Sequence, residues 1–339
     1  MATAETKKVD EVIASSRRRM LTMGGAALAG MALTSMAKAQ SSTTLTDADY
    51  LNFALNLEYL EAEFYTLAAS GQTIDQMGLG LTGTGTQGTV TTKGGGPSAC
   101  KVPFANTLVQ SYAQEIATEE RNHVKFLRGA LGSSAVAQPA IDLLNSFNTL
   151  AGLLGLGLSS FDPFADDIHF LLGAYIFEDV GVTAYTGAAP SLTTSSNLDA
   201  AAGIQGVEAY HAGLVRTVIY GLDQSATTLG PAGTATAVAA AISKLRATVD
   251  GTNKISSTMT DGDDIGLGTQ QVMLNGSSKV TASAIVNATT TGSINAATMG
   301  NTAGSMVFAR TAAQVLAIVY AGGSGKGGFF PAGLNGNVK

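Results

Sequence analysis

The chain has 339 residues, of which 45% are hydrophobic and 13% are charged. Its formal net charge of -6 implies no basic surface for binding nucleic acid. The length allows one large domain or two smaller ones with a sizeable core. Cys100 is the only cysteine, which excludes an intramolecular disulfide. We expect this thiol to be buried and inert, the alternative being a disulfide between two chains.

The N-terminus has the pattern of an export signal. Residues 16–21 read Ser-Arg-Arg-Arg-Met-Leu, which resembles the bacterial twin-arginine pattern. An apolar run over about 23–36 follows, and 37–39 form a small-x-small cleavage site. We therefore predict a cleaved signal peptide over 1–39 and a periplasmic or extracellular mature protein. The alternative is a retained membrane anchor, but the apolar run is too short to span a bilayer comfortably.

Two Glu-x-x-His pairs stand out among the polar residues. Glu120 precedes His123 by three positions, and Glu208 precedes His211 by three. This spacing puts a carboxylate and an imidazole on one helix face, one turn apart. Two such pairs, each with one further glutamate from another helix, form the di-metal carboxylate site of a four-helix bundle. One pair alone usually marks a solvated helix face, so the prediction depends on the whole set.

The first predicted helix supplies one of the further glutamates. It begins at Thr46, with Asp49 in the reciprocal position of a capping box, and runs to about Ser70. Glu58 falls on the apolar stripe of this helix and is therefore expected to face inward. We choose Glu58 as the ligand and keep Glu61, one turn further along, as the alternative.

Three more helices complete the predicted bundle. Their expected ranges are about 103–131, 162–190 and 198–220. The third begins at Asp162-Pro163, an Asp cap followed by Pro in the first turn, and carries Glu178. A long loop rich in Gly and Thr covers 71–102, a length that is often functional or mobile. A shorter helical piece is expected from Pro139 to about Leu150.

The two halves of the bundle echo each other. Glu58 precedes Tyr65 by seven residues, and Glu178 precedes Tyr185 by seven. Each tyrosine therefore lies two turns along the stripe of a ligand. We predict that both hydroxyls hydrogen-bond a ligating carboxylate or water and take part in catalysis. The alternative is a pair of core aromatics with satisfied hydroxyls.

A C-terminal extension over 223–339 is expected to pack on the bundle. Periodic apolar residues predict added helices at 238–249 and 304–321, with irregular structure over 250–303 and short strands near 279–286. The aspartates at 261, 263 and 264 lack the full ligand spacing of a calcium loop, so we favour an exposed turn. The aromatic pair in the Gly-rich end, at 329–330, would dock on the protein or stay loose.

Four carboxylates and two imidazoles suit a pair of iron or manganese ions better than copper. The expected ligands are Glu58, Glu120, His123, Glu178, Glu208 and His211. Buried together without metal, the carboxylates would repel and raise one another's pKa. We expect Glu120 and Glu208 to bridge the two ions, and Glu58 and Glu178 to bind one ion each.

Residues 45–222 resemble the ferritin-like superfamily. The stretch 51–65, LNFALNLEYLEAEFY, is similar to the first helix of exported bacterial ferritin-like proteins related to plant desiccation-related proteins. FARTAAQVL at 308–316 and GFFP at 328–331 resemble the C-terminal segment of that branch. The resemblance implies that the di-iron ligands of the superfamily fall on the six residues named above. The long first loop and the C-terminal extension depart from storage ferritins, which puts bulk iron storage in doubt.

The sequence therefore predicts an all-α core. A ferritin-like four-helix bundle over 40–222 holds a di-metal carboxylate site, and a mostly irregular extension adds one or two helices. The favoured function is a di-iron or di-manganese oxidoreductase that reacts with O2 or peroxide in oxidative or desiccation stress. The alternatives are a non-catalytic stress or envelope protein and a manganese catalase. We expect no nucleic-acid partner and no membrane span after signal cleavage, and the chain could form a homo-oligomer.

Overall fold

The computed structural model describes residues 44–223, 229–251, 264–274, 278–284 and 307–339. The chain divides into two units, Met1–Leu45 and Thr46–Lys339. The expected signal peptide over 1–39 lies outside the described residues. No helix among those described is both long enough and apolar enough to cross a membrane.

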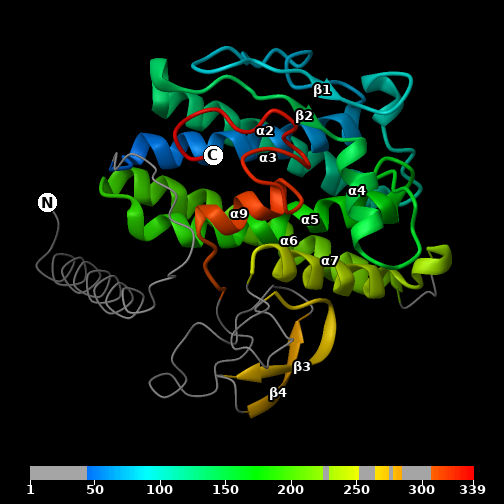
Figure 1. Cartoon of the computed structure of the whole chain (residues 1–339). Coiled ribbons are helices and arrows are strands. Elements are labelled where there is room, and N and C mark those ends of the chain that lie inside the picture. Colours follow the sequence, from blue (N-terminus) through cyan, green and yellow to red (C-terminus); the bar gives the residue numbers. More distant parts are fainter. Residues whose placement is uncertain (1–43, 224–228, 252–263, 275–277, 285–306) are drawn as a thin grey trace, which may run out of the picture. The chain divides into compact units, whose positions relative to one another are not determined.

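Four long helices form the core of Thr46–Lys339, as predicted (Figure 1). They are α2 (Asp47–Ser70), α3 (Thr107–Leu131), α5 (Asp167–Ala188) and α6 (Ser195–Asp223). Helix α2 packs along α3, and α5 packs along α6. The two parts of the sequence with matching Glu and Tyr spacings therefore begin two separate helix pairs. Apolar residues from all four helices form one buried cluster.

The ends of these helices follow local capping. Helix α2 starts as predicted, because Thr46 and Asp49 form a capping box. Helix α3 starts at Thr107 rather than near Pro103, because the Asn106 side chain accepts from two backbone amides of the first turn, at 2.9 and 3.3 Å. The predicted start of the third helix at Asp162-Pro163 was also wrong: the cap of α5 is Asp166, which accepts from the His169 amide at 2.9 Å.

The segments between the described helices contain short strands, 3-10 turns and one short helix. Strand β1 (Val90–Thr91) pairs in parallel with β2 (Ile141–Asp142), where a helix was expected from Pro139. Helix α4 (Asn145–Leu153) follows instead, because the Asp142 carboxylate accepts from the amides at 144 and 145. Short 3-10 turns are η1 (Pro97–Cys100), η2 (Gly132–Ser134), η3 (Ala189–Ser191) and η4 (Gly230–Ala232). Cys100 is buried, as predicted.

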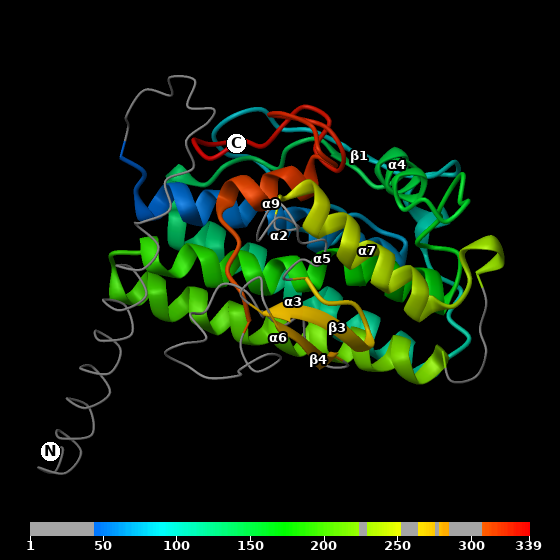
Figure 2. The ribbon, with the colours of Figure 1, turned by 60° about the horizontal axis from the view of Figure 1, so that its bottom comes forward.

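The C-terminal extension covers α5 of the bundle. It contains α7 (Ala235–Val249), the antiparallel strands β3 (Gly268–Leu274) and β4 (Ser278–Ala284), and α9 (Ala312–Val319). Figure 2 shows α7 and α9 side by side, and both contact α5. Helix α9 begins later than expected, at the capping box of Thr311 and Gln314. The Phe329 and Phe330 side chains are buried, so the aromatic end docks on the protein.

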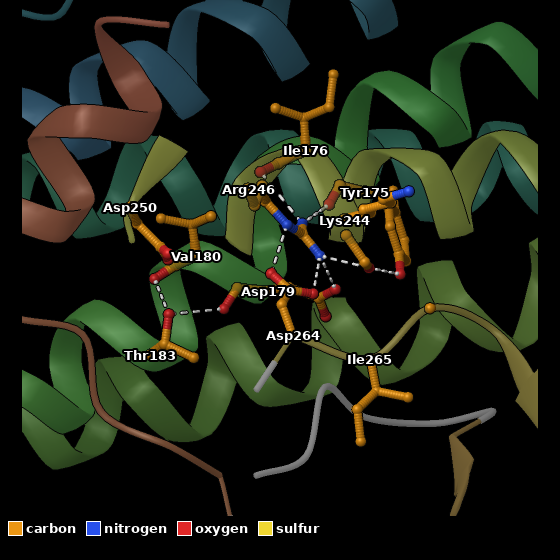
Figure 3. A network of polar contacts seen from close by, with 12 residues as sticks. Tyr175, Ile176, Asp179, Val180, Thr183, Lys244, Arg246, Asp250, Asp264 and Ile265 are labelled. Carbon is orange, nitrogen blue, oxygen red and sulfur yellow. Dashed lines mark hydrogen bonds and ion pairs between the residues drawn. The ribbon is translucent and has the colours of Figure 1, made fainter. Parts of the chain in front are cut away.

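A buried network of charges joins the extension to the bundle (Figure 3). Arg246 of α7 donates to Asp264 at 2.8 Å and to Asp179 of α5 at 2.7 Å. Arg310 also donates to Asp264, at 2.6 Å, and to Asp250, at 2.7 Å. The expectation of an exposed turn was therefore wrong at Asp264, which is buried between two guanidinium groups; positions 261 and 263 lie outside the described residues.

Candidate metal centre

Four helices bring seven polar side chains to one place in the interior of the bundle. All seven are buried, and none is more than 8% exposed: Glu58 and Glu61 of α2, Glu120 and His123 of α3, Glu178 of α5, and Glu208 and His211 of α6. Six of them are the predicted ligands. The short-range spacing within each helix sets which face each residue occupies, and the packing of the helix pairs sets which faces meet.

Glu58, Glu120, His123 and Glu208 form the first of two ligand groups. One ligand atom from each lies within 4.8 Å of the others. The Nδ1 atom of His123 lies 3.1 Å from Glu58, 3.4 Å from Glu120 and 3.6 Å from Glu208, measured to the nearest carboxylate oxygen. Three carboxylates and one imidazole from three helices thus surround a common point.

Glu120, Glu178 and His211 form the second ligand group, also with ligand atoms within 4.8 Å of one another. The Nδ1 atom of His211 lies 3.1 Å from Glu120 Oε1 and 3.4 Å from Glu178 Oε2. Glu120 belongs to both groups and turns one oxygen toward each imidazole. This is the arrangement of a bridging carboxylate, which we predicted for Glu120. Glu208, the second predicted bridge, belongs only to the group of His123.

The unpartnered atoms of the cluster indicate what it can hold. Both carboxylate oxygens of Glu120 and of Glu208 lack a hydrogen-bond partner, as do Oε2 of Glu178 and Nδ1 of His211. Leaving buried carboxylates unpartnered is costly unless cations or protons neutralise them. Carboxylate oxygens with imidazole nitrogens are a donor set that iron and manganese accept. The residues therefore fit a pair of such ions.

The chain matches the family described as "Ferritin-like domain" over residues 46–221, more than half of its length. The chain belongs to this ferritin-like family. The resemblance inferred from the sequence is therefore confirmed.

Two curated relatives extend this comparison. The chain is 34% identical over 180 residues to the desiccation-related protein PCC13-62 of Craterostigma plantagineum, covering 52% of this chain and 53% of that protein. It thus spans about half the length of that relative. It is also 26% identical over 298 residues to the ferritin-like catalase Nec2 of Nesocodon mauritianus, covering 86% of this chain and 84% of that protein. No solved structure gives a significant match.

Each of the two tyrosines of this ferritin-like bundle hydrogen-bonds a glutamate of the other helix pair. The Tyr65 hydroxyl of α2 donates to Oε1 of Glu178 on α5, and the Tyr185 hydroxyl of α5 donates to Oε1 of Glu58 on α2. Each tyrosine therefore holds the glutamate of the opposite helix, not the one seven residues before it. The second oxygen of each glutamate faces an imidazole. The hydrogen bonds agree with our expectation, and a catalytic role of the tyrosines stays a prediction.

A partner of His211 was missed by sequence reasoning. The Nε2 atom of His211 lies 2.7 Å from Oε2 of Glu119, a residue of α3 outside the predicted ligand set. A carboxylate on the outer nitrogen of an imidazole fixes its tautomer and ring orientation when the other nitrogen binds metal. The only signal in the sequence was that Glu119 directly precedes the shared ligand Glu120.

Glu61 is the seventh side chain of this buried set and its fifth carboxylate. Burial, followed by the nearby carboxylates of Glu120, Glu178 and Glu58, raises its pKa well above the usual range. Neither ligand group includes Glu61. Of the two alternatives on α2, Glu58 is the one grouped with His123.

The imidazoles neutralise part of the cluster before any metal binds. Although burial opposes ionisation, the neighbouring imidazoles of His123 and His211, at 3.4 and 3.1 Å, hold the pKa of Glu120 at about 2. Burial also opposes protonation of His123, but the charges of Glu58 and Glu120 raise its pKa to about 12. Burial raises the pKa of Glu58 itself to about 7. Metal ions must therefore displace protons from the imidazoles in order to bind.

Proposed function

We propose that this protein is an exported ferritin-like oxidoreductase whose buried cluster holds two iron or manganese ions and decomposes hydrogen peroxide. The observation that carries the proposal is the position of Glu120, which is shared by both ligand groups and has no hydrogen-bond partner for either oxygen. The alignment with a relative named a ferritin-like catalase, over 86% of this chain, supports peroxide as the substrate.

The overall reaction converts two molecules of hydrogen peroxide into two of water and one of O2. One peroxide takes up two electrons and two protons, and the other releases them. When bound, the metal pair would supply the site that accepts and returns these electrons. The chain itself supplies charge and order: the glutamates balance the ions, and the crossed tyrosines Tyr65 and Tyr185 keep Glu178 and Glu58 in position.

The experiment loads the purified mature protein with manganese or iron and follows O2 release from hydrogen peroxide with an oxygen electrode. O2 evolution that depends on metal, and that is lost in Glu120→Ala, is the expected result. Uptake of O2 by the iron-loaded protein without peroxide decomposition would instead indicate an oxidase. Metal-loaded protein without either reaction would contradict the proposal.

A non-catalytic role in stress is the second candidate. A relative named a desiccation-related protein favours it, as do the imidazole–carboxylate pairs that neutralise part of the cluster without metal. The same oxygen-electrode experiment separates the two candidates, because a non-catalytic protein would bind metal or stay metal-free without releasing O2 from hydrogen peroxide.

Export by the twin-arginine route is part of the proposal. The residues that carry it are Arg17 and Arg18. Replacement of both by lysine should leave the unprocessed chain in the cytoplasm, which cell fractionation would detect. Unchanged processing and location in that variant would contradict this route.

A further inference from the structure

A narrow pocket is lined both by half-buried residues and by buried carboxylates of the metal centre. This outer pocket has a volume of about 30 Å³ and is lined in part by Ala54, Leu57, Glu58, Glu61, Gly181 and Ala184. Ala54 and Leu57 are half-buried, whereas Glu58 and Glu61 are buried. The outer pocket therefore lies between α2 and α5 and includes both half-buried residues and carboxylates of the cluster.

A second pocket continues from the same place. This inner pocket has a volume of about 20 Å³ and is lined in part by Leu57, Glu61, Gly181, Ile318, Val319 and Phe329. Leu57, Glu61 and Gly181 line both pockets. The remaining three come from α9 and the docked aromatic end, so the extension closes the inner pocket.

The size and chemistry of the pockets limit what can pass. A cavity of about 30 Å³ exceeds the roughly 10–15 Å³ that one water molecule needs, so it admits only a molecule of a few atoms. The wall of the outer pocket is mostly hydrocarbon, with Glu58, Glu61 and Tyr185 at its buried end. In the described lining of the inner pocket, Glu61 is the one polar side chain. Apolar walls favour an uncharged molecule over an ion.

We propose that the outer pocket is the path by which an uncharged molecule the size of hydrogen peroxide reaches the metal centre, and that Glu61 binds it where the two pockets meet. The inference rests on the proposed function and adds two features to it: selection of the substrate by size, and a binding residue that belongs to neither ligand group. A carboxyl oxygen of Glu61 can accept a hydrogen bond from a peroxide O–H. Ala54 and Ala184 select by size, because a larger side chain at either position would narrow the pocket.

The first test uses xenon, which occupies small apolar cavities, on the full mature chain without metal. Xenon NMR and crystals under xenon pressure should show saturable uptake in the outer pocket of the wild type. Ala54→Leu should abolish this uptake. Ala69→Leu is the matched control, since Ala69 is also half-buried on α2 but does not line the pocket. Absence of xenon from the wild-type pocket, or unchanged uptake in Ala54→Leu, would overturn the path.

The second test measures peroxide turnover of the manganese-loaded protein. Ala54→Leu should lower kcat/KM for hydrogen peroxide roughly tenfold without changing metal content, whereas Ala69→Leu should leave it unchanged. An unchanged kcat/KM in Ala54→Leu would overturn the path. Xenon uptake in a chain that binds no metal would support the outer pocket as a small-molecule site and contradict the proposed function alone.

The role of Glu61 is tested by Glu61→Gln, which preserves the shape of the side chain. The variant should take up xenon and two metal ions like the wild type, while its KM for hydrogen peroxide rises roughly tenfold. Loss of a metal ion in Glu61→Gln would make Glu61 a ligand and would overturn its role as the peroxide-binding residue.

Discussion

Gly181 of α5 lies directly against the carboxylate of Glu208 on α6. A Cβ atom at Gly181 would stand 2.1 Å from Glu208 Oε2, far closer than two nonbonded atoms can approach. The contact lies inside a helix where glycine costs stability relative to alanine. Glycine at position 181 therefore has a packing reason, because the absence of a Cβ atom leaves room for the Glu208 carboxylate beside His123.

Gly181→Ala should displace the Glu208 carboxylate and weaken metal binding. We expect metal content to fall in the mature protein, as measured by mass spectrometry of the bound metals, while the helical circular dichroism is retained. Gly206→Ala on α6 is the control, because a Cβ there meets nothing within 4 Å. Its metal content should not change, and its stability should rise by about 0.5 to 1 kcal/mol. Equal metal content in the two variants would contradict the packing role of Gly181.

Tyr65→Phe and Tyr185→Phe should each weaken metal binding by roughly 10- to 100-fold, because each removes a hydrogen bond that orients a ligating carboxylate. Competition with a chelator measures the affinity. Tyr210→Phe is the control, since Tyr210 is 77% exposed on α6. If both buried variants bound metal like the control, the tyrosines would be core residues with no part in the site.

The buried carboxyl of Glu63 should make the free energy of unfolding depend on pH, independently of the metal centre. Burial raises the pKa of its carboxyl to about 8, from an ordinary value of 4.5. The folded protein therefore binds the Glu63 proton more tightly than the unfolded chain does. This contribution to the free energy of unfolding is fully present below pH 4.5 and is lost as the pH rises to about 8. Each unit of pKa difference corresponds to about 1.4 kcal/mol.

Glu63→Gln imitates the neutral acid and should remove this part of the pH dependence. Urea unfolding at pH 5, 7 and 9 measures the difference between variant and wild type at each pH. The variant should gain stability relative to the wild type as the pH rises. A difference that does not vary with pH would show that Glu63 is not protonated in the folded protein.

Arg246→Met should destabilise the protein by about 3 to 5 kcal/mol, because it leaves Asp179 and Asp264 buried with fewer positive partners. Lys244→Ala is the control on the same helix, where the side chain is exposed, and should change stability by less than about 0.5 kcal/mol. Thermal unfolding of the two variants checks this. Similar midpoints would mean that the network in Figure 3 contributes little to holding the extension.

The sequence predicted the parts of this protein that depend on short-range spacing. The Glu-x-x-His pairs, the capping box of α2 and the apolar stripe that carries Glu58 are all set within a few turns of one helix. The predicted starts of α3 and α5 were wrong because several residues near each start could have served as the N-cap. Asn106 and Asp166 form the observed caps, whereas Asp162 accepts from the Phe164 amide and from Lys93 in the turn before α5.

Contacts between distant segments could not be predicted. The crossed hydrogen bonds of Tyr65 and Tyr185 depend on how α2 and α5 are rotated against each other. The pairing of Arg310 with Asp264 joins residues 46 positions apart, which no periodicity reveals. The partner of His211, Glu119, comes from a different helix pair and was visible only as an acidic neighbour of Glu120.

The central claim is that Glu120 joins two ligand groups around a pair of metal ions. The most direct measurement is the number of iron and manganese ions per chain in the mature wild-type protein and in the Glu120→Ala, Glu208→Ala double variant. We predict two ions per wild-type chain and less than one in a folded double variant. No bound metal in the wild type under metal-replete conditions, or equal metal content in the two proteins, would contradict the account.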